Sequence, residues 1–341
     1  MQNLYVTIGP SSFNKDTVKK LADAGATLFR INMSHTSLKV LESVIKSLQD
    51  WSNIPVCIDS EGAQVRNRVM KSNSEFFEKN SLIKLYDNSE MIGDGSKMSL
   101  VPPGIVSQVQ VDDQIKVDFD SVEMIVIDKS EQYLTAKVLT EGYVGSNKAC
   151  DISRVLDLPA LTEKDKIALD IAKSCLIKDF SLSFCNCSDD VIEMRNFLDK
   201  GDKVISKIES ILGVRNIESI AIESDELLID RGDLSREVPI ASIPFIQRSI
   251  IGKARAMNVP VNVATNLLES MINKRTPTRS EVNDVVSTLL MGANGLVLAA
   301  ETAVGKHPLL AVSMIKELMN TTLHYYDSGI DTFLTLNNTR A

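Results

Sequence analysis

The sequence predicts an α/β protein with a (β/α)8 TIM barrel and a small all-β lid domain inserted after the third barrel strand. Short apolar runs alternate with helical patterns along most of the 341 residues, which is typical of barrels and doubly wound sheets. The runs number eight, as a closed barrel requires. One interval loses the helical period and alternates like strands instead. A doubly wound open sheet is the alternative, but the regular count favours the barrel.

The eight apolar runs give the expected barrel strands. They occupy residues 3–9, 26–34, 54–60, 180–186, 202–209, 225–233, 259–266 and 294–302. Short apolar runs of this kind are typical of strands that are buried on both faces in a parallel sheet.

Helical patterns between these runs predict the outer helices of the barrel. They cover residues 14–25, 37–50, 188–201, 239–258 and 279–293, and a last helix is expected near 308–326. Capping residues stand where the helices should begin, and Gly or Asn closes several of them.

The interval between Arg66 and Leu158 predicts the inserted domain, because strand alternation and turn residues replace the helical period there. Pro159 and the helix-start pattern Thr162–Asp165 mark the return to the barrel. We therefore assign residues 1–66 and 158–327 to the barrel, 67–157 to the lid domain and 328–341 to a loosely docked tail.

Composition and charge limit the classes of partner. The chain is 44% hydrophobic and 24% charged, with a net charge of −8, which is ordinary for a soluble globular protein. It lacks a Lys/Arg-rich block and an apolar run of about 18 residues, so we expect neither nucleic acid nor a membrane as partner. The N-terminus lacks the pattern of a signal peptide. The five scattered cysteines are expected to be reduced thiols in a cytoplasmic protein.

Charged side chains stand at the expected C-terminal ends of the strands, where barrel enzymes place their active sites. Lys207 and Glu209 are two positions apart in one run and should therefore point to the same side of the strand. Glu209 and Asp233, on neighbouring strand ends, suit a hard divalent cation such as Mg²⁺. Arg30, Arg66 and Lys207 suit a phosphate or a carboxylate. This set predicts phosphoryl transfer or enolate stabilisation; a ring of structural ion pairs is the alternative.

Longer motifs resemble those of the pyruvate kinase family from about residue 3 to 325. The segments TIGPSS, FRINMSH, LDLPALTEKD, VISKIES, RGDLS, VATNLLESMINKRTPTRSEVNDV and ETAVGKHPL carry the resemblance. It implies transfer of a phosphoryl group from phosphoenolpyruvate to ADP, giving pyruvate and ATP. Members of this family have a further C-terminal regulatory domain, which we do not expect in this sequence.

The resemblance implies roles for the charged residues. Lys207 would stabilise the phosphoryl group during transfer. Glu209 and Asp233 would hold the divalent cation, Mg²⁺ or Mn²⁺, that bridges phosphoenolpyruvate or its enolate. Arg30 would contact the phosphate, with Arg66 beside it.

The resemblance also implies how the substrate carboxylate is bound. The backbone N–H groups of Gly232 and Asp233 would donate to it together with Thr265. Thr265 would also lie near the carbon that is protonated when the enolate becomes pyruvate. Lys207, Thr265 and Arg30 are therefore the expected catalytic residues.

Two further sites follow from the same resemblance. Arg66, Lys148 and His35 would bind the nucleotide. A potassium site would be formed by Asn32, Ser34, Asp59 and Ser60.

Departures from the family pattern gather on the nucleotide side. Glu61 and Val304 stand where the family has lysines, and the second of these lysines helps to bind nucleotide phosphates. Gln64 replaces a glutamate linked to potassium dependence, so the need for K⁺ is left open. Thr36 replaces a glycine. Each lost charge-assisted hydrogen bond should weaken the binding of a polyanion by roughly 1.5–3 kcal/mol.

Three functions are therefore weighed. The first is a short pyruvate kinase. The second is a related metal-dependent enzyme that acts on phosphoenolpyruvate or the pyruvate enolate, with another phosphoryl acceptor or as an aldolase. The third is a ligand-binding or scaffold protein without activity. A homo-oligomer formed through the barrel is left open.

Overall fold

Eight parallel strands close into a barrel in the computed structural model, which describes residues 2–88, 90–118 and 121–338. The strands are β1 (Asn3–Thr7), β2 (Leu28–Asn32), β3 (Val56–Asp59), β13 (Asp179–Leu182), β14 (Lys203–Ile208), β15 (Glu226–Asp230), β16 (Val261–Ala264) and β17 (Gly295–Leu298). Around the barrel their order is β1-β17-β16-β15-β14-β13-β3-β2. Each expected run supplies one strand, so the barrel is confirmed and the open sheet is wrong.

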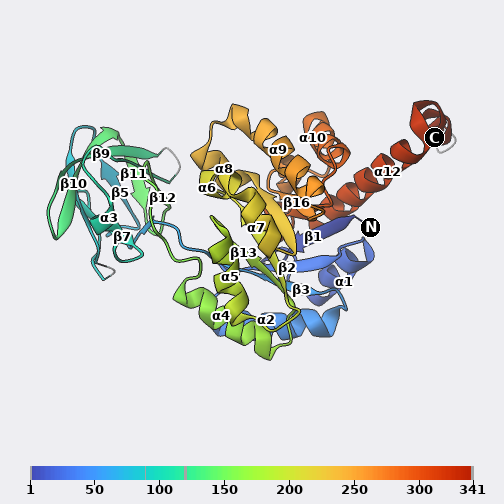
Figure 1. Cartoon of the computed structure of the whole chain (residues 1–341), viewed down its shortest axis with the longest axis horizontal. Coiled ribbons are helices and arrows are strands. Elements are labelled where there is room, and N and C mark those ends of the chain that lie inside the picture. Colours follow the sequence, from blue (N-terminus) through green and yellow to red (C-terminus); the bar gives the residue numbers. More distant parts are fainter. Residues whose placement is uncertain (1, 89, 119–120, 339–341) are drawn as a thin grey trace. The chain divides into compact units, whose positions relative to one another are not determined.

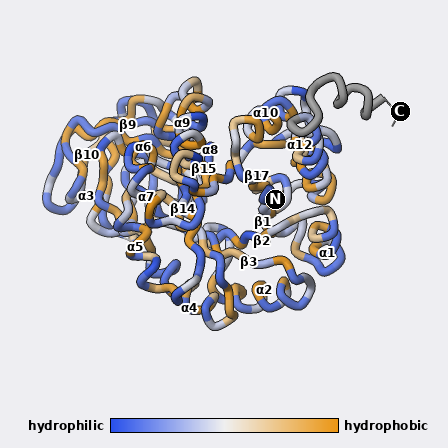
Figure 2. The backbone as a smooth tube through the Cα atoms, turned by 45° about the vertical axis from the view of Figure 1, so that its right-hand side comes forward, coloured by the Kyte–Doolittle hydropathy of each residue, from blue (hydrophilic) through white to orange (hydrophobic). Residues whose placement is uncertain are grey.

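Helices surround this barrel, as Figure 1 shows for α1, α2, α4, α5, α7 and α9. The longer ones are α1 (Lys15–Asp23), α2 (Leu38–Trp51), α4 (Glu163–Ser174), α5 (Ser188–Phe197), α9 (Ile243–Ala256), α10 (Arg279–Leu290) and α12 (Pro308–Asn338). The shorter ones are α6 (Ile211–Arg215), α7 (Ile217–Glu223), α8 (Arg231–Glu237), α11 (Ala300–Ala303) and the 3-10 turns η1 (Ile240–Ser242) and η2 (Glu269–Ile272). In Figure 2 the helices alternate between hydrophobic and hydrophilic stretches, as expected when one face is buried.

Local sequence explains where the principal helices begin. The side chain of Thr162 accepts from the backbone N–H of Asp165, whose carboxylate accepts in return, and this capping box starts α4. Thr278 and Glu281 form the same capping box at the start of α10. Each box satisfies backbone donors that a helix N-terminus leaves without partners.

The inside of the barrel is built in layers, because alternate residues of a strand face the same side. An apolar layer fills the middle and consists of Tyr5, Leu28, Cys57, Ile205, Leu228, Ala264 and Val297. Two positions further along five strands, the same inward face becomes polar. This polar layer consists of Thr7, Arg30, Asp59, Lys207 and Asp230. All five of its members are buried.

The chain divides into two compact units, Met1–Gly62 with Ala160–Ala341, and Ala63–Pro159. The second unit has its own hydrophobic core and a seven-stranded sheet in the order β12-β8-β9-β10-β6-β7-β4. Its elements are β4 (Arg66–Asn67), β5 (Ser74–Phe77), β6 (Leu82–Tyr86), β7 (Lys97–Val101), α3 (Ile105–Gln108), β8 (Gln114–Val117), β9 (Val122–Lys129), β10 (Tyr133–Thr140), β11 (Gly142–Gly145) and β12 (Cys150–Ile152). Apart from the single turn of α3, the described helices and strands of this unit are all strands, which is compatible with the expected β-rich insert.

Several expected boundaries are corrected. The sixth strand ends at Asp230, because this residue caps α8, which begins at Arg231. The helix expected over 239–258 divides into η1 and α9, and Pro244 stands in the first turn of α9, where proline is tolerated. The last helix was expected to end near 326, but its backbone continues to Asn338. Loose docking of residues 328–341 remains a prediction. Residues 339–341 lie outside the described residues.

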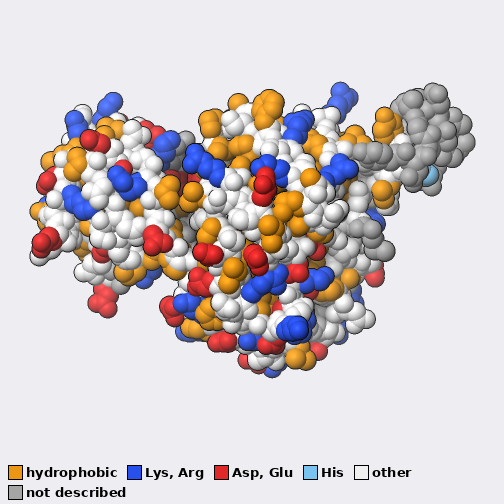
Figure 3. All heavy atoms as spheres, viewed as in Figure 1, with side chains coloured by type: hydrophobic (Ala, Val, Ile, Leu, Met, Phe, Trp, Pro, Cys, Tyr) orange, Lys and Arg blue, Asp and Glu red, His pale blue; other side chains and the backbone are white. Residues whose placement is uncertain are grey.

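The surface carries both signs of charge. On the face shown in Figure 3, Lys and Arg side chains are interspersed with Asp and Glu. None of the helices in the described part of the chain combines the length and the apolar composition needed to cross a membrane.

Candidate active site

Charged residues of the polar layer meet at the C-terminal end of the barrel. Arg30, Asp59, Lys207 and Asp230 come from β2, β3, β14 and β15, and each is at most 7% exposed. Charges this deeply buried must be paired or must contact a ligand, because burial removes their hydration. The ion pairs in this layer therefore show which of the charged side chains are paired within the protein and which are available for a ligand.

Lys207 is the centre of this layer. Its Nζ lies 2.8 Å from Oε1 of Glu209 and 3.3 Å from Oδ1 of Asp59, and it donates to Oγ of Ser183 at 3.0 Å. Burial alone would lower the pKa of Lys207, but the carboxylates of Asp59, Glu209 and Asp230 raise it overall. Lys207 therefore carries a fixed positive charge at the barrel mouth.

Arg30 adds a second fixed cation. Its Nη1 lies 3.3 Å from Oδ2 of Asp59, and its Nε donates to Oγ1 of Thr7 at 3.0 Å. Burial opposes its charge, yet the nearby carboxylates, Asp59 first, raise its pKa. Nη1 is buried and makes no hydrogen bond in the described structure, which leaves a donor available for an anionic ligand.

Ser183 is a member of this site that the sequence analysis missed. Besides accepting from Lys207, its Oγ donates to the backbone oxygen of Ser60 at 2.6 Å, and its N–H donates to Oγ of Ser60 at 2.9 Å. These bonds fix Ser183 between the ends of β3 and β13. The polar residues Ser181 and Ser183 alternate with apolar ones in the fourth run, and this alternation could have identified Ser183 as inward-facing.

Three carboxylates converge beside Lys207. One oxygen each from Glu209, Asp230 and Asp233 lies within 4.8 Å of the other two, and this is the one such metal-binding group found in the described residues. Oε1 of Glu209 is buried, and its one close partner in the described residues is Nζ of Lys207 at 2.8 Å. Burial and the neighbouring carboxylates raise the pKa of Glu209, although the positive charge of Lys207 acts in the opposite direction. Carboxylate oxygens are the ligands that Mg²⁺ and Mn²⁺ prefer, so the residues present fit a divalent cation.

A backbone N–H orients Glu209, and a side chain contacts Asp233. The N–H of Phe184 donates to Oε2 of Glu209 at 2.6 Å, and Phe184 has a left-handed φ of +51°. A bulky residue in this conformation is strained, and such strain is often found at functional sites. Asp233 lies in the first turn of α8, and Nη1 of Arg236 lies 3.3 Å from its Oδ1.

Asp230 is the second residue that the sequence analysis missed. Its Oδ1 accepts from Oγ1 of Thr265 at 2.6 Å and from the N–H of Gly232 at 3.1 Å. Two of the three donors that were expected to bind a substrate carboxylate are thus engaged by a carboxylate of the protein. Asp230 is two positions beyond Leu228 of the apolar layer, and strand alternation could have placed it inside the barrel.

Thr265 is held in a strained backbone conformation. Its φ is +73°, a value that β-branched residues rarely adopt. Arg231 donates to the backbone oxygen of Thr265 from Nε at 3.1 Å and from Nη2 at 2.7 Å. The other guanidinium nitrogen of Arg231 pairs with Asp284 at 2.7 Å. This clamp fixes the position of Thr265 at the end of β16.

The four residues of the expected potassium site lie on neighbouring strand ends, where Asn32 pairs with Asp59 across β2 and β3. Oδ1 of Asn32 accepts from the N–H of Ser34 at 2.8 Å. Both oxygens of Asp59 face the cations Arg30 and Lys207. Oδ1 of Asp59 makes no hydrogen bond, and a potassium site remains a prediction.

The expected nucleotide-binding residues are not gathered in one unit. Arg66 and Lys148 belong to the second unit. There Arg66 donates to Oε1 of Gln64 at 2.7 Å, and Lys148 pairs with Asp118 at 2.9 Å. Their roles remain predictions.

The other nucleotide-side residues lie in the barrel unit. His35 is exposed. Glu61 pairs with Lys164 at 3.1 Å, so its negative charge has a cationic partner. Val304 is 57% exposed and offers only an apolar surface.

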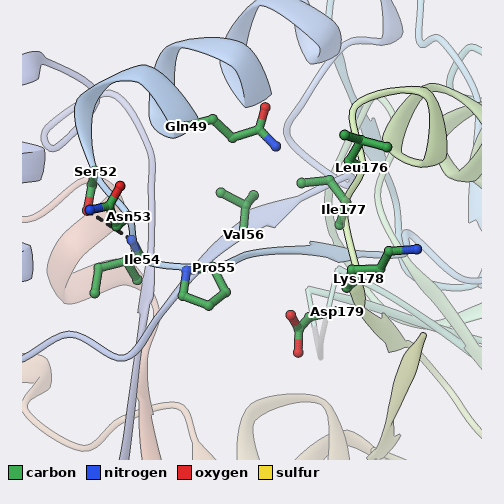
Figure 4. Close-up of a pocket in the computed structure, with 10 residues that line it drawn as sticks. All are labelled: Gln49, Ser52, Asn53, Ile54, Pro55, Val56, Leu176, Ile177, Lys178 and Asp179. Carbon is green, nitrogen blue, oxygen red and sulfur yellow. Dashed lines mark hydrogen bonds between the residues drawn. The ribbon is translucent and has the colours of Figure 1, made fainter. Parts of the chain in front are cut away.

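A surface pocket lies at the other end of the barrel. It has a volume of about 460 Å³ and is lined by Gln49, Ser52–Val56 and Leu176–Asp179, which lead into the N-terminal ends of β3 and β13. In Figure 4 the amino group of Lys178 points away from Asp179. The pocket thus lies apart from the carboxylates and cations described above.

Comparisons with known proteins agree with this geometry. The family model of the pyruvate kinase barrel domain matches residues 2–312. A pyruvate kinase from Bacillus licheniformis is 31% identical over 328 residues, which cover 92% of this chain and 56% of that protein. One from Thermococcus litoralis is 30% identical over 334 residues, which cover 95% of this chain and 70% of that protein.

A solved structure gives the same result. The crystal structure of a pyruvate kinase from Cryptosporidium parvum superposes with a TM-score of 0.85 at 27% identity, over 93% of this chain and 68% of that one. The chain spans little more than half the length of the Bacillus licheniformis and Geobacillus stearothermophilus enzymes, 56% in each case. With the family model matching most of its length, the chain belongs to the pyruvate kinase family.

Proposed function

We propose that the chain is a pyruvate kinase-like phosphotransferase that converts phosphoenolpyruvate and ADP into pyruvate and ATP. The observation that carries this proposal is the buried contact of Lys207 with Glu209, 2.8 Å apart, beside the carboxylates of Asp230 and Asp233. A fixed cation next to a hard-metal site is the arrangement that phosphoryl transfer requires.

Arg30 and Lys207 would bind the phosphoryl group. Both are permanently charged and buried, so they are already oriented before the charge of the transferring group develops. Arg30 also has a buried Nη1 without a hydrogen bond, which suits a phosphate oxygen.

Glu209 and Asp233 would hold Mg²⁺ or Mn²⁺. When bound, such a cation neutralises the negative charge of the phosphoryl and enolate oxygens. The backbone of Phe184 already orients Glu209 for this task.

Thr265 would act at the methylene carbon of the enolate, where the new C–H bond forms. Its hydroxyl and the N–H of Gly232 now donate to Asp230. Binding of a substrate carboxylate by these donors would therefore require them to exchange Asp230 for the substrate. Their spacing around Oδ1 of Asp230 supports the assignment, because it shows that both can donate to one carboxylate oxygen.

The proposal also includes binding of ADP and of K⁺, assembly into a homo-oligomer and a location in the cytoplasm. All five cysteines are free, which suits a reducing compartment. Arg66, Lys148 and His35 would contact ADP.

A different acceptor is the second candidate function. It is favoured by Glu61, whose charge is matched by Lys164, and by the uncharged, exposed Val304. A nucleotide side with fewer cations binds a polyanion less tightly.

Phosphorus NMR of phosphoenolpyruvate with Mg²⁺ distinguishes the two functions. We expect the phosphoenolpyruvate signal to disappear and ATP signals to grow only when ADP is present. Loss of phosphoenolpyruvate without ATP, or no reaction with ADP while phosphoenolpyruvate still binds, would favour the second function.

A further inference from the structure

Asp230 is a buried carboxylate without a cationic partner. It is 7% exposed, and no Lys or Arg nitrogen of the described residues lies within ion-pair distance of it. By contrast, Glu209 has Lys207 and Asp233 has Arg236. Lys207 and Arg30 interact with Asp230 only from beyond ion-pair distance. A buried carboxylate without a directly paired cation is costly, so a ligand that supplies positive charge is expected beside Asp230.

The hydrogen bonds of Asp230 hold one carboxylate oxygen in place and leave the other oxygen without a donor. Oδ1 accepts from Thr265 and from Gly232, whereas Oδ2 accepts no hydrogen bond from the described residues. Carboxylates that bind metals are commonly oriented in this way by donors in the surrounding shell. Oδ1 also caps α8, which is the structural alternative for this side chain.

Glu209 gives a second, independent indication of a ligand. It is 1% exposed, and the ammonium group of Lys207 is the one close partner of its Oε1 in the described residues. This oxygen belongs to the group of three carboxylates that lie within 4.8 Å of one another. Lys207 contacts it but is shared with Asp59, so one ammonium group serves several carboxylates.

We propose that Asp230 is a third carboxylate ligand of the divalent cation, and that it enables the protein to bind this cation before any substrate. The inference rests on the metal site of the proposed function, to which the family resemblance assigns only Glu209 and Asp233. A third anionic oxygen strengthens binding, since the number of charged ligands tunes the affinity of oxygen sites for divalent cations.

The test is a titration of the free protein with Mn²⁺ alone, followed by the electron paramagnetic resonance signal of unbound Mn²⁺. Asp230→Asn retains an amide oxygen that can cap α8 and accept from Thr265, but it removes the charge. We expect one Mn²⁺ per chain in the unmodified protein and at least a tenfold weaker affinity in Asp230→Asn. Asp233→Asn should weaken binding as well. Glu218→Gln, which removes an exposed carboxylate paired with Lys253, should leave the affinity unchanged.

Two results would overturn the proposal. Mn²⁺ affinity of Asp230→Asn equal to that of the unmodified protein, with Asp233→Asn impaired, would show that Asp230 only caps α8. Absence of Mn²⁺ binding without substrate would show that the three carboxylates do not suffice. Thermal unfolding with and without Mn²⁺ shows whether each variant is folded, because bound cation raises the melting temperature. Turnover is not used, so failure here leaves the phosphotransferase proposal standing.

Discussion

Nζ of Lys207 lies 2.8 Å from Oε1 of Glu209, and both residues are at least nine-tenths buried. The two side chains face one side because they are two positions apart at the end of β14. Burial removes water from both charges, so either charge without the other would raise the free energy of the folded state. The ammonium group of Lys207, which we propose to act in phosphoryl transfer, therefore also stabilises the C-terminal end of the barrel.

Removal of the ammonium group should destabilise the protein. Lys207→Met leaves Asp59 and Glu209 without their shared cation, so we expect the free energy of unfolding to fall by roughly 3–5 kcal/mol. Urea denaturation measures this. Lys46→Met breaks an exposed pair with Glu42 and should change stability little. Equal effects of the two substitutions would contradict the importance of the buried network.

Ser183 should act as a positioning residue for Lys207. Ser183→Ala removes the hydroxyl that accepts from Lys207 and donates to Ser60, so kcat should fall about tenfold while KM changes little. Ser181→Ala is the matched control, since Ser181 is also buried in β13 but contacts Cys57. Equal kcat values for the two variants, or a change confined to KM, would exclude this role.

Glu281 should make stability depend on pH. Partial burial opposes its ionisation, but hydrogen bonds from Ser270 and Thr278 outweigh burial and lower its pKa below 4.5. Its contribution to stability is therefore complete above about pH 4.5 and is lost as the pH falls through the lowered pKa. We expect the stability difference between the unmodified protein and Glu281→Gln to shrink as the pH falls, measured by urea denaturation at each pH. A constant difference would argue against this account.

Tyr5 should affect stability but not catalysis. At the N-terminal side of the barrel interior its hydroxyl donates to Oε2 of Glu226 at 2.7 Å, which also accepts from Asn262. Tyr5→Phe should lower the free energy of unfolding by about 1–2 kcal/mol and leave kcat unchanged, because active sites of this fold lie at the opposite end. Denaturation and turnover measured on one preparation test both parts. A large loss of kcat in a folded variant would be inconsistent with this separation of the two ends.

The barrel could be predicted because its signals are local. Each strand is a short apolar run, and capping pairs such as Thr162 with Asp165 mark helix starts. The order of strands in the second unit could not be predicted in the same way. There β6 pairs with the distant β10 and, in parallel, with β7, and such pairings depend on contacts between segments far apart in the chain.

The site was predicted where charge made residues conspicuous. Lys207, Glu209 and Arg30 were chosen as strand-end ions, and the structure gathers them with Asp59. Ser183 was missed because an uncharged hydroxyl gives no such signal.

Asp230 was missed for a different reason. The sixth strand was expected to end at residue 233, whereas it ends at Asp230 and α8 begins at Arg231. Asp230 was therefore not identified as the residue at the strand end. Strained conformations, such as that of Thr265, arise from packing of the whole barrel and leave no clear pattern in the sequence.

The most direct test of the account is the rate of pyruvate formation from phosphoenolpyruvate and ADP with Mg²⁺, for the unmodified protein, Lys207→Met and Lys46→Met. We predict turnover in the unmodified protein and in Lys46→Met, and a loss of at least a thousandfold, about 4 kcal/mol, in folded Lys207→Met. Turnover that persists in Lys207→Met, or its absence from all three proteins, would contradict the assignment of Lys207 and of ADP-dependent phosphoryl transfer.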